Sequence, residues 1–217
     1  MRLRKKWWAR PEMQQDSKVI FKPENFKDKW KYEFKNNNPI HLELGSGKGQ
    51  FISSLSTENK QVNYIGIDLK DEVLVYALRK VNQVESDNVR LIPTFIEGVD
   101  NIFGTDEISR VYINFCNPWP KAAHNKRRLT HPRFIKKYKG FIKKGSEVWF
   151  KTDDLDLFND SLEYFENEGF NELYKTYNLT QSNFEENIQT EYEEKFISFG
   201  KKINFAIFEY EGLNKND

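Results

Sequence analysis

The stretch IHLELGSGKGQFISSLS, residues 40–56, carries the pattern that decides the fold. It opens with a short apolar run that reads as a β-strand and ends in residues with helical spacing. Gly45, Gly47 and Gly49 lie between the two, where glycine lets the backbone turn tightly and approach a ligand. A strand, a glycine-rich turn and a helix in immediate succession predict a ligand-binding loop at a strand end.

Strands and helices alternate on the C-terminal side of this stretch. Short apolar runs predict strands at 62–69, 88–93, 109–115, 146–152, 170–178 and 202–210, and helical spacing predicts helices at 71–84, 131–142 and 154–169. This alternation predicts an α/β fold with a mainly parallel seven-stranded sheet and helices on both faces. The last two strands have no clear helix between them, so we expect one antiparallel strand near the C-terminus.

The composition narrows the class of protein. The chain of 217 residues has 38% hydrophobic residues and no apolar run of membrane-spanning length, so we expect no membrane segment. Cys116 is the single cysteine, which favours the reducing cytoplasm. The three histidines are scattered and predict no metal site. With no Pro/Gly-rich linker, we expect a single domain over residues 1–217.

Charge is segregated along the chain, although the formal net charge is only +1. Residues 1–10 and 121–146 are rich in Lys and Arg and contain no acid, whereas residues 153–194 are strongly acidic. Residues 1–15 therefore form a basic, Trp-containing N-terminal arm. Each basic run alone is compatible with a solvated surface, but two of them favour a polyanionic partner, because phosphates reward clustered cations.

The glycine-rich turn resembles one nucleotide-type motif better than two others. A P-loop fails because Gly49 follows Lys48, and a dinucleotide fingerprint fails because residue 50 is Gln. The order acidic-x-G-x-G-x-G, beginning at Glu43, resembles the first motif of S-adenosylmethionine-dependent methyltransferases. Asp68, at the end of the second strand, is placed to accept the ribose hydroxyls of an adenosine. The alternative is a structural turn with a helix-capping Asp.

Two further strand ends have candidate residues. The loop 93–98 follows the third strand and should lie along the adenine, with Phe95 and Glu97 as the contacts. Asn117 ends the fourth strand, next to the expected position of the methyl donor, and is followed by Pro118 and Pro120. Each proline restricts the residue before it to extended backbone, so Asn117 and Trp119 lie in a stiff corner that suits positioning, or in a structural turn.

Five segments together resemble a specific family, the bacterial tRNA (guanine-N7)-methyltransferases. They are "MRLRKKWW" (1–8), "LELGSGKGQF" (42–51), the run from "NPWPK" to "THPRF" (117–134), "KTDD" (151–154) and "TEYEEKF" (190–196). The resemblance covers residues 1 to about 200. It implies a Rossmann-like class I methyltransferase domain, S-adenosylmethionine as cofactor, and tRNA as substrate with the guanosine at position 46 of the variable loop.

The resemblance also implies roles for individual residues. The residues implied to line the guanosine are Lys121, Asp153, Thr190, Glu191, Tyr192 and Glu193. The residues implied to hold the tRNA backbone are Ala123, His124, Asn125, Lys126, Arg127 and Arg128. Asn117 is implied to serve both the cofactor and catalysis, and here this chain departs from the family, which usually has Asp. The family also usually has a basic residue at the place of Ala123 and an acid near Phe95.

Two other readings stay open at this stage. A methyltransferase acting on a small molecule or a protein explains the glycine loop and Asp68 but not the two basic runs. A non-catalytic tRNA-binding protein on the same scaffold, inactivated at Asn117 or Ala123, explains the basic runs without methyl transfer. The sequence is compatible with a monomer or a homodimer.

Overall fold

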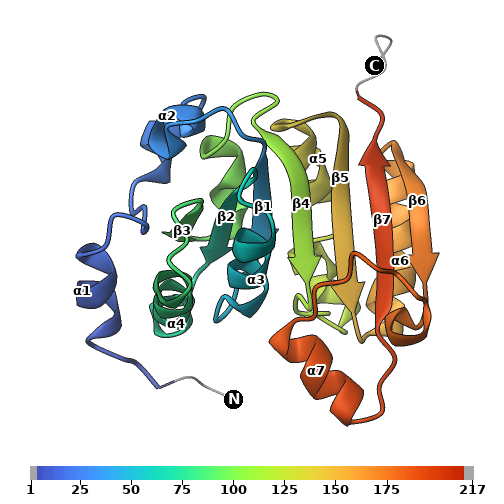
Figure 1. Ribbon diagram of the computed structural model, residues 1–217. Helices are drawn as coiled ribbons and strands as arrows, with labels where there is room; N and C mark the ends of the chain where they lie inside the picture. The colour runs from blue at the N-terminus through green and yellow to red at the C-terminus, as the bar shows by residue number, and fades with distance from the viewer. Residues whose placement is uncertain (1–3, 213–217) are drawn as a thin grey trace. The chain divides into compact units, whose positions relative to one another are not determined.

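The computed structural model describes residues 4–212, which fall into two compact units that divide between Phe103 and Gly104 (Figure 1). Residues 1–3 of the predicted basic arm lie outside the described range. Each unit is built around its own strands, and the expectation of a single domain over the whole chain stays a prediction.

The first unit is a parallel α/β arrangement. Its elements are α1 (Ala9–Gln14), α2 (Trp30–Phe34), β1 (Ile40–Leu44), α3 (Gln50–Glu58), β2 (Asn63–Asp68), α4 (Asp71–Gln83) and β3 (Val89–Pro93), with 3-10 helices at Pro23–Phe26 and Ile96–Asn101. β2 lies between β1 and β3 and is parallel to both. The carboxyl ends of the three strands therefore lie at one edge, from which the predicted ligand loops leave.

Helix α4 shows how the sequence shapes this unit. Its apolar residues recur at helical spacing, and Leu74, Leu78 and Val81 are buried. Asp71 and Glu72 occupy the first turn, where the helix dipole stabilises negative charge. The helix packs against α3, β2 and β3. It begins at Asp71, shortly after β2 ends at Asp68.

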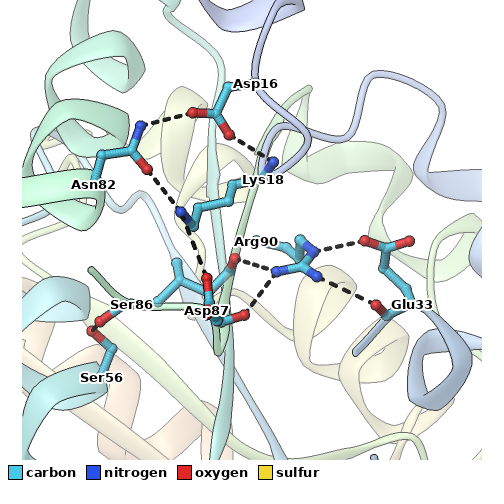
Figure 2. A network of polar contacts seen from close by, with 9 residues as sticks. Asp16, Lys18, Glu33, Ser56, Asn82, Ser86, Asp87 and Arg90 are labelled. Atoms are coloured by element: carbon cyan, nitrogen blue, oxygen red, sulfur yellow. Dashed lines mark hydrogen bonds and ion pairs between the residues drawn. The ribbon is translucent and has the colours of Figure 1, made fainter. Parts of the chain in front are cut away.

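The N-terminal segment is tied to this unit by polar side chains, shown in Figure 2. Asn82 on α4 donates to Asp16, and Lys18 donates to Asn82. Arg90 on β3 donates to the Glu33 carboxylate, with 2.7 Å between Nε and Oε1, and to the Glu33 carbonyl. The Ile20 N–H donates to the Leu91 carbonyl, and the Leu91 N–H donates to the Lys18 carbonyl. These bonds cover the edge of β3, which protects that edge from pairing with another chain.

The second unit is a mixed sheet with helices. Its elements are β4 (Ile108–Asn114), α5 (Pro132–Lys139), β5 (Ile142–Thr152), α6 (Leu155–Asn167), β6 (Phe170–Thr176), α7 (Glu191–Ser198) and β7 (Asn204–Tyr210), with 3-10 helices at Ala122–Arg127 and Leu179–Gln181. β4 and β5 are parallel, and β7 lies antiparallel between β5 and β6. The expected seven strands, with one antiparallel strand near the C-terminus, are confirmed within residues 4–212.

The predicted helix at 131–142 is too long. It ends at Lys139, followed by Gly140, and Ile142 already belongs to β5 and pairs with Ile108. At its start, His131 caps the helix, because its Nδ1 accepts a hydrogen bond from the backbone N–H of Arg133. Burial and the charges of Arg133 and Arg128 lower the pKa of His131, which favours the neutral ring that this acceptor role requires.

Helices α1, α2 and α7 have no counterpart among the predicted elements. The first two are five or six residues long, too short for helical periodicity to reveal them. α2 is fixed instead by Trp30, which is buried, touches Phe103 and donates from its indole N–H to the Ile102 carbonyl. No helix within residues 4–212 is long and apolar enough to cross a membrane.

We predict that Gly49→Ala destabilises the protein by about 1–3 kcal/mol, the usual cost of overpacking. Gly49 has φ +76°, and a Cβ there would lie 2.5 Å from the Cβ of Ala77 on α4. The measurement is the urea midpoint of unfolding. Gly98→Ala is the matched control, because a Cβ there meets no atom within 4 Å, and it should change the free energy of unfolding by less than about 0.5 kcal/mol. Equal effects at both positions would contradict the close approach.

Candidate functional site

The loop after β1 depends on left-handed backbone. Gly45, Gly47 and Gly49 have φ of +85°, +56° and +76°, a region that glycine enters without steric cost. The backbone N–H groups of Gly45 and Ser46 both donate to the Ile67 carbonyl, at 2.8 and 3.0 Å. The loop is therefore held against the end of β2, where Asp68 follows.

Asp68 connects this loop to the next one. Its Oδ2 accepts a hydrogen bond from the Gly47 N–H, and its Oδ1 accepts from the Lys70 N–H, each at 3.0 Å. A carboxylate has about four acceptor sites. Asp68 can therefore keep both backbone contacts and still accept hydroxyl groups from a ligand.

The loop has the features of a ligand cradle. A Cβ added at Gly45 or Gly47 would meet no atom within 4 Å, so open space lies beside both glycines. Ser46 is buried, and among the described residues its hydroxyl has no hydrogen-bond partner. Glu43, one residue before the end of β1, is also buried, which places a carboxylate beside this space. These features fit a ligand with a cationic end and hydroxyl groups.

The adenine-loop candidates lie at the same edge. Asp68 is paired in register with Pro93, the last residue of β3, so the loop 93–98 begins beside the Asp68 carboxylate. Phe95 and Glu97 on this loop are both exposed. The structure thus brings the predicted cofactor residues of the first unit to one set of adjoining strand ends.

In the second unit, the chain turns sharply after β4. Phe115 and Trp119 both have positive φ, +50° and +44°, which is uncommon for residues other than glycine. The side-chain oxygen of Asn117 accepts a hydrogen bond from the Trp119 N–H at 3.1 Å. A stiff corner is therefore present, and Asn117 itself helps to hold it, but the prediction of extended backbone at Trp119 is wrong, because its φ is positive.

The basic segment that follows forms a 3-10 helix over Ala122–Arg127. Ala123, Lys126 and Arg127 are exposed, and His124 and Asn125 are half-buried. The Arg127 guanidinium lies 5.0 Å from the centre of the Trp119 ring, whose edge contacts His124. Trp119 thus contacts two of the side chains that were predicted to hold the tRNA backbone.

Arg128 does not behave as the sequence led us to expect. It is 4% exposed, its Nε donates to the Pro118 carbonyl at 2.7 Å, and its Nη1 forms an ion pair with Asp160 on α6. A guanidinium turned inward in this way is not available to a phosphate. The RNA contact of Arg128 stays a prediction that this burial does not favour, and Lys126 and Arg127 are the exposed cations of this segment.

Two of the residues predicted to contact the guanosine, Glu193 and Thr190, form contacts within the protein instead. Glu193 is 1% exposed and forms an ion pair with buried Lys151, at 3.0 Å between Oε2 and Nζ. Asn187 donates to the other oxygen of Glu193. Thr190 is also buried and caps α7, because its hydroxyl oxygen accepts from the Glu193 N–H at 2.9 Å. Glu193 thus ties α7 to the end of β5, and Thr190 caps the helix.

The remaining guanosine candidates are more accessible. Lys121 and Tyr192 are exposed, and Glu191 is half-buried. Asp153 follows β5 directly and forms an ion pair with Lys201. The Tyr192 ring stacks on Phe115, with 6.1 Å between ring centres, so α7 lies against the end of β4. Asp153 and Glu191 are the acceptors of this group that a guanine could use.

Sequence reasoning missed residues that act through buried contacts. Lys151 is one residue of "KTDD", and Asp160 is one of several acids in α6. Nothing in the sequence around them distinguishes either residue from a charged residue on the surface. Burial raises the pKa of the Cys116 thiol to about 12. Among residues 4–212, no group of three or more His, Cys, Asp or Glu side chains is arranged to hold a metal ion.

The two tryptophans of the basic arm differ in their surroundings. Trp8 packs edge-on against Tyr76 and beneath the Arg79 guanidinium, both on α4. Arg79 in turn pairs with Glu12 on α1. Trp7 is 82% exposed, beside the exposed cations Arg4 and Lys5. The arm is thus held on α4 by Trp8, while Trp7 faces solvent.

Solved structures with low sequence identity share this fold. An antibiotic-related methyltransferase aligns with a TM-score of 0.61 at 18% identity, over 84% of this chain and 93% of that one. The 16S rRNA methyltransferase KamB aligns with a TM-score of 0.62 at 8% identity, over 85% and 93% of the two chains. These likenesses confirm the predicted class I methyltransferase fold.

Sequence comparison identifies the family. A family model described as a putative methyltransferase matches residues 37–206. A tRNA (guanine-N(7)-)-methyltransferase of Clostridium tetani is 56% identical over 207 residues, which are 95% of this chain and 98% of the relative. Its namesake from Desulfitobacterium hafniense is 57% identical over 209 residues, 96% and 98% of the two chains. The chain therefore belongs to the tRNA (guanine-N(7)-)-methyltransferase family.

Proposed function

We propose that the protein transfers a methyl group from S-adenosylmethionine to N7 of a guanosine in tRNA, at position 46 of the variable loop. The observation that carries this proposal is the identity of about 56% to relatives of that name, over nearly their whole length. The ligand cradle after β1 and the exposed cations after β4 support it. A tRNA substrate would place the enzyme in the cytoplasm.

The residues of the first unit fit the proposed cofactor. S-adenosylmethionine supplies a methyl group activated by its sulfonium charge. The buried Glu43 carboxylate would attract the cationic end of the amino-acid portion, and the open space beside Gly45 and Gly47 would admit it. Asp68 would accept the ribose hydroxyls, and the loop with Phe95 and Glu97 would cover the adenine.

The reaction asks for positioning more than for proton transfer. Guanine N7 has a lone pair in the neutral base, so no proton has to be removed before it attacks. Asn117, a neutral amide engaged with the Trp119 N–H, is suited to orientation and not to general base catalysis. Alignment of two reactants can contribute about 7–11 kcal/mol to lowering a barrier.

The acidic side chains of the second unit would recognise the base. Guanine presents N–H donors at N1 and N2, and Asp153 and Glu191 offer acceptors for them. Methylation of N7 leaves a positive charge on the base, which nearby carboxylates stabilise. Lys126, Arg127 and Lys121 would hold the tRNA phosphates, and the splayed base would then reach the site.

The decisive test is incubation of the protein with unmodified tRNA and methyl-labelled S-adenosylmethionine. We expect N7-methylguanosine by nucleoside mass spectrometry, and chemical cleavage of the product at a single position in the variable loop. Transfer of label to a protein or a small molecule, with none to tRNA, would overturn the proposal. Binding of tRNA with no transfer of label would favour the non-catalytic reading instead.

We predict that Asp68→Asn weakens S-adenosylmethionine binding by roughly 10- to 150-fold, because hydrogen bonds to a charged group contribute about 1.5–3 kcal/mol. Calorimetric titration measures the change. Asp87→Asn is the matched control, since the Asp87 side chain is fully exposed and its ion pair with Lys18 is long, at 3.9 Å. Normal affinity in Asp68→Asn would rule out the ribose role.

We predict that Trp7→Ala weakens tRNA binding by roughly 5- to 150-fold, because stacking of a base on an aromatic side chain contributes about 1–3 kcal/mol. The salt dependence of binding should not change, since no charge is removed. Filter binding at several salt concentrations measures both quantities. Tyr32→Ala removes an aromatic side chain that is 68% exposed in the same unit and should leave the affinity unaltered. Equal losses in the two variants would argue against stacking at Trp7.

A further inference from the structure

We propose that Arg128 is a positioning residue, which fixes the orientation of the peptide group between Pro118 and Trp119 and thereby the groups that meet the tRNA. This inference rests on the proposed function and deepens it, because it assigns a role in turnover to a residue buried away from the substrate. Its evidence is the set of contacts around one peptide group.

Both polar atoms of this peptide group are held by side chains. Its oxygen, the Pro118 carbonyl, accepts from Nε of Arg128 at 2.7 Å. Its N–H, that of Trp119, donates to the side-chain oxygen of Asn117 at 3.1 Å. The peptide group is therefore held by a hydrogen bond at its oxygen and another at its N–H, and rotating it by half a turn would break both.

These two hydrogen bonds hold Trp119 in a backbone conformation that residues other than glycine disfavour. With φ +44°, Trp119 lies in the left-handed region, which costs a residue other than glycine roughly 1–2 kcal/mol. A flip of the peptide group changes ψ of Pro118 and φ of Trp119 together, and so offers a way out of this region. Without Arg128, the hydrogen bond that the Trp119 N–H donates to Asn117 would remain to oppose that flip.

The guanidinium is itself held in place. Arg128 is 4% exposed, and its Nη1 pairs with Asp160 on α6, whose side chain is 42% exposed. A planar guanidinium can serve a carbonyl and a carboxylate at once through its fixed fork of donors, which an ammonium group cannot match. Asp160 thus orients Arg128, and Arg128 orients the corner.

The corner carries the groups that face the substrate. The Trp119 ring lies under the Arg127 guanidinium and against His124, so a flipped peptide would shift the ring relative to both, while Arg127 keeps its charge. It would also release the Asn117 side chain from its donor. Arg128 therefore acts on the reaction through Asn117 and Trp119 and does not touch the tRNA itself.

The test compares Arg128→Gln with Arg127→Gln, a neighbouring pair in which the first cation is buried and the second exposed. In Arg128→Gln we expect the single-turnover rate at saturating tRNA and cofactor to fall at least tenfold, with no change in the salt dependence of tRNA binding. In Arg127→Gln we expect weaker tRNA binding and a salt slope smaller by about one. Arg128→Lys should not restore the rate.

Two further measurements cover a variant that folds poorly. Asp160→Asn changes a half-exposed side chain of α6, and we expect a smaller fall in rate, again with an unchanged salt slope. Residue-specific amide exchange by NMR follows the Trp119 N–H directly, and Arg128→Gln should lower its protection at least tenfold. Thermal unfolding and cofactor titration establish that each variant is folded.

Three results would overturn the inference. They are a wild-type rate in Arg128→Gln, a salt slope that falls there as it does in Arg127→Gln, and a Trp119 amide that stays protected in Arg128→Gln. Failure of the proposed function is a separate result, namely the absence of methyl transfer by the unaltered protein. The amide-exchange experiment still decides the role of Arg128 in that case, because it needs no activity.

Discussion

Left-handed backbone at the strand ends is the constraint on which both candidate sites depend. After a parallel strand that ends at a functional group, the chain has to change direction within a few residues, and backbone with positive φ makes this turn. After β1, three glycines meet the requirement without steric cost. After β4, Phe115 and Trp119 meet it with bulky side chains, so other groups have to hold them. The first turn leaves open space beside the backbone, whereas the second presents aromatic surface and fixed polar groups.

Residues of one short motif divide between buried and exposed positions. In "TEYE", Thr190 and Glu193 are buried and anchor α7, whereas Tyr192 is exposed and stacks on Phe115. The Lys151–Glu193 pair lies away from water, where removing either partner would leave an uncompensated charge and destabilise the protein by several kcal/mol. The accessible groups of α7 can therefore stay exposed because their neighbours face the core.

The order of strands and helices was predictable because the local spacing of apolar residues indicates each element. The glycine-rich turn after β1 was predictable because the spacing of its glycines indicates such a turn. The contacts of Arg128 were not. Its neighbour Arg127 has the same letter and opposite burial, and the difference comes from Asp160, which lies 32 positions away along the chain. For the same reason, Trp7 and Trp8 look alike in sequence but differ in exposure, because only Trp8 meets Tyr76 and Arg79 on α4.

The position of β7 determines when the second unit can assemble. This strand is the last of the chain, yet it lies between β5 and β6 and is hydrogen-bonded to both. During synthesis, β6 emerges from the ribosome with no neighbour to pair with until residues 204–210 follow. The first unit, whose three strands are adjacent in the chain, can close much earlier. A nascent chain that stalls before Asn204 therefore exposes the unpaired edges of β5 and β6, which are templates for pairing with another chain.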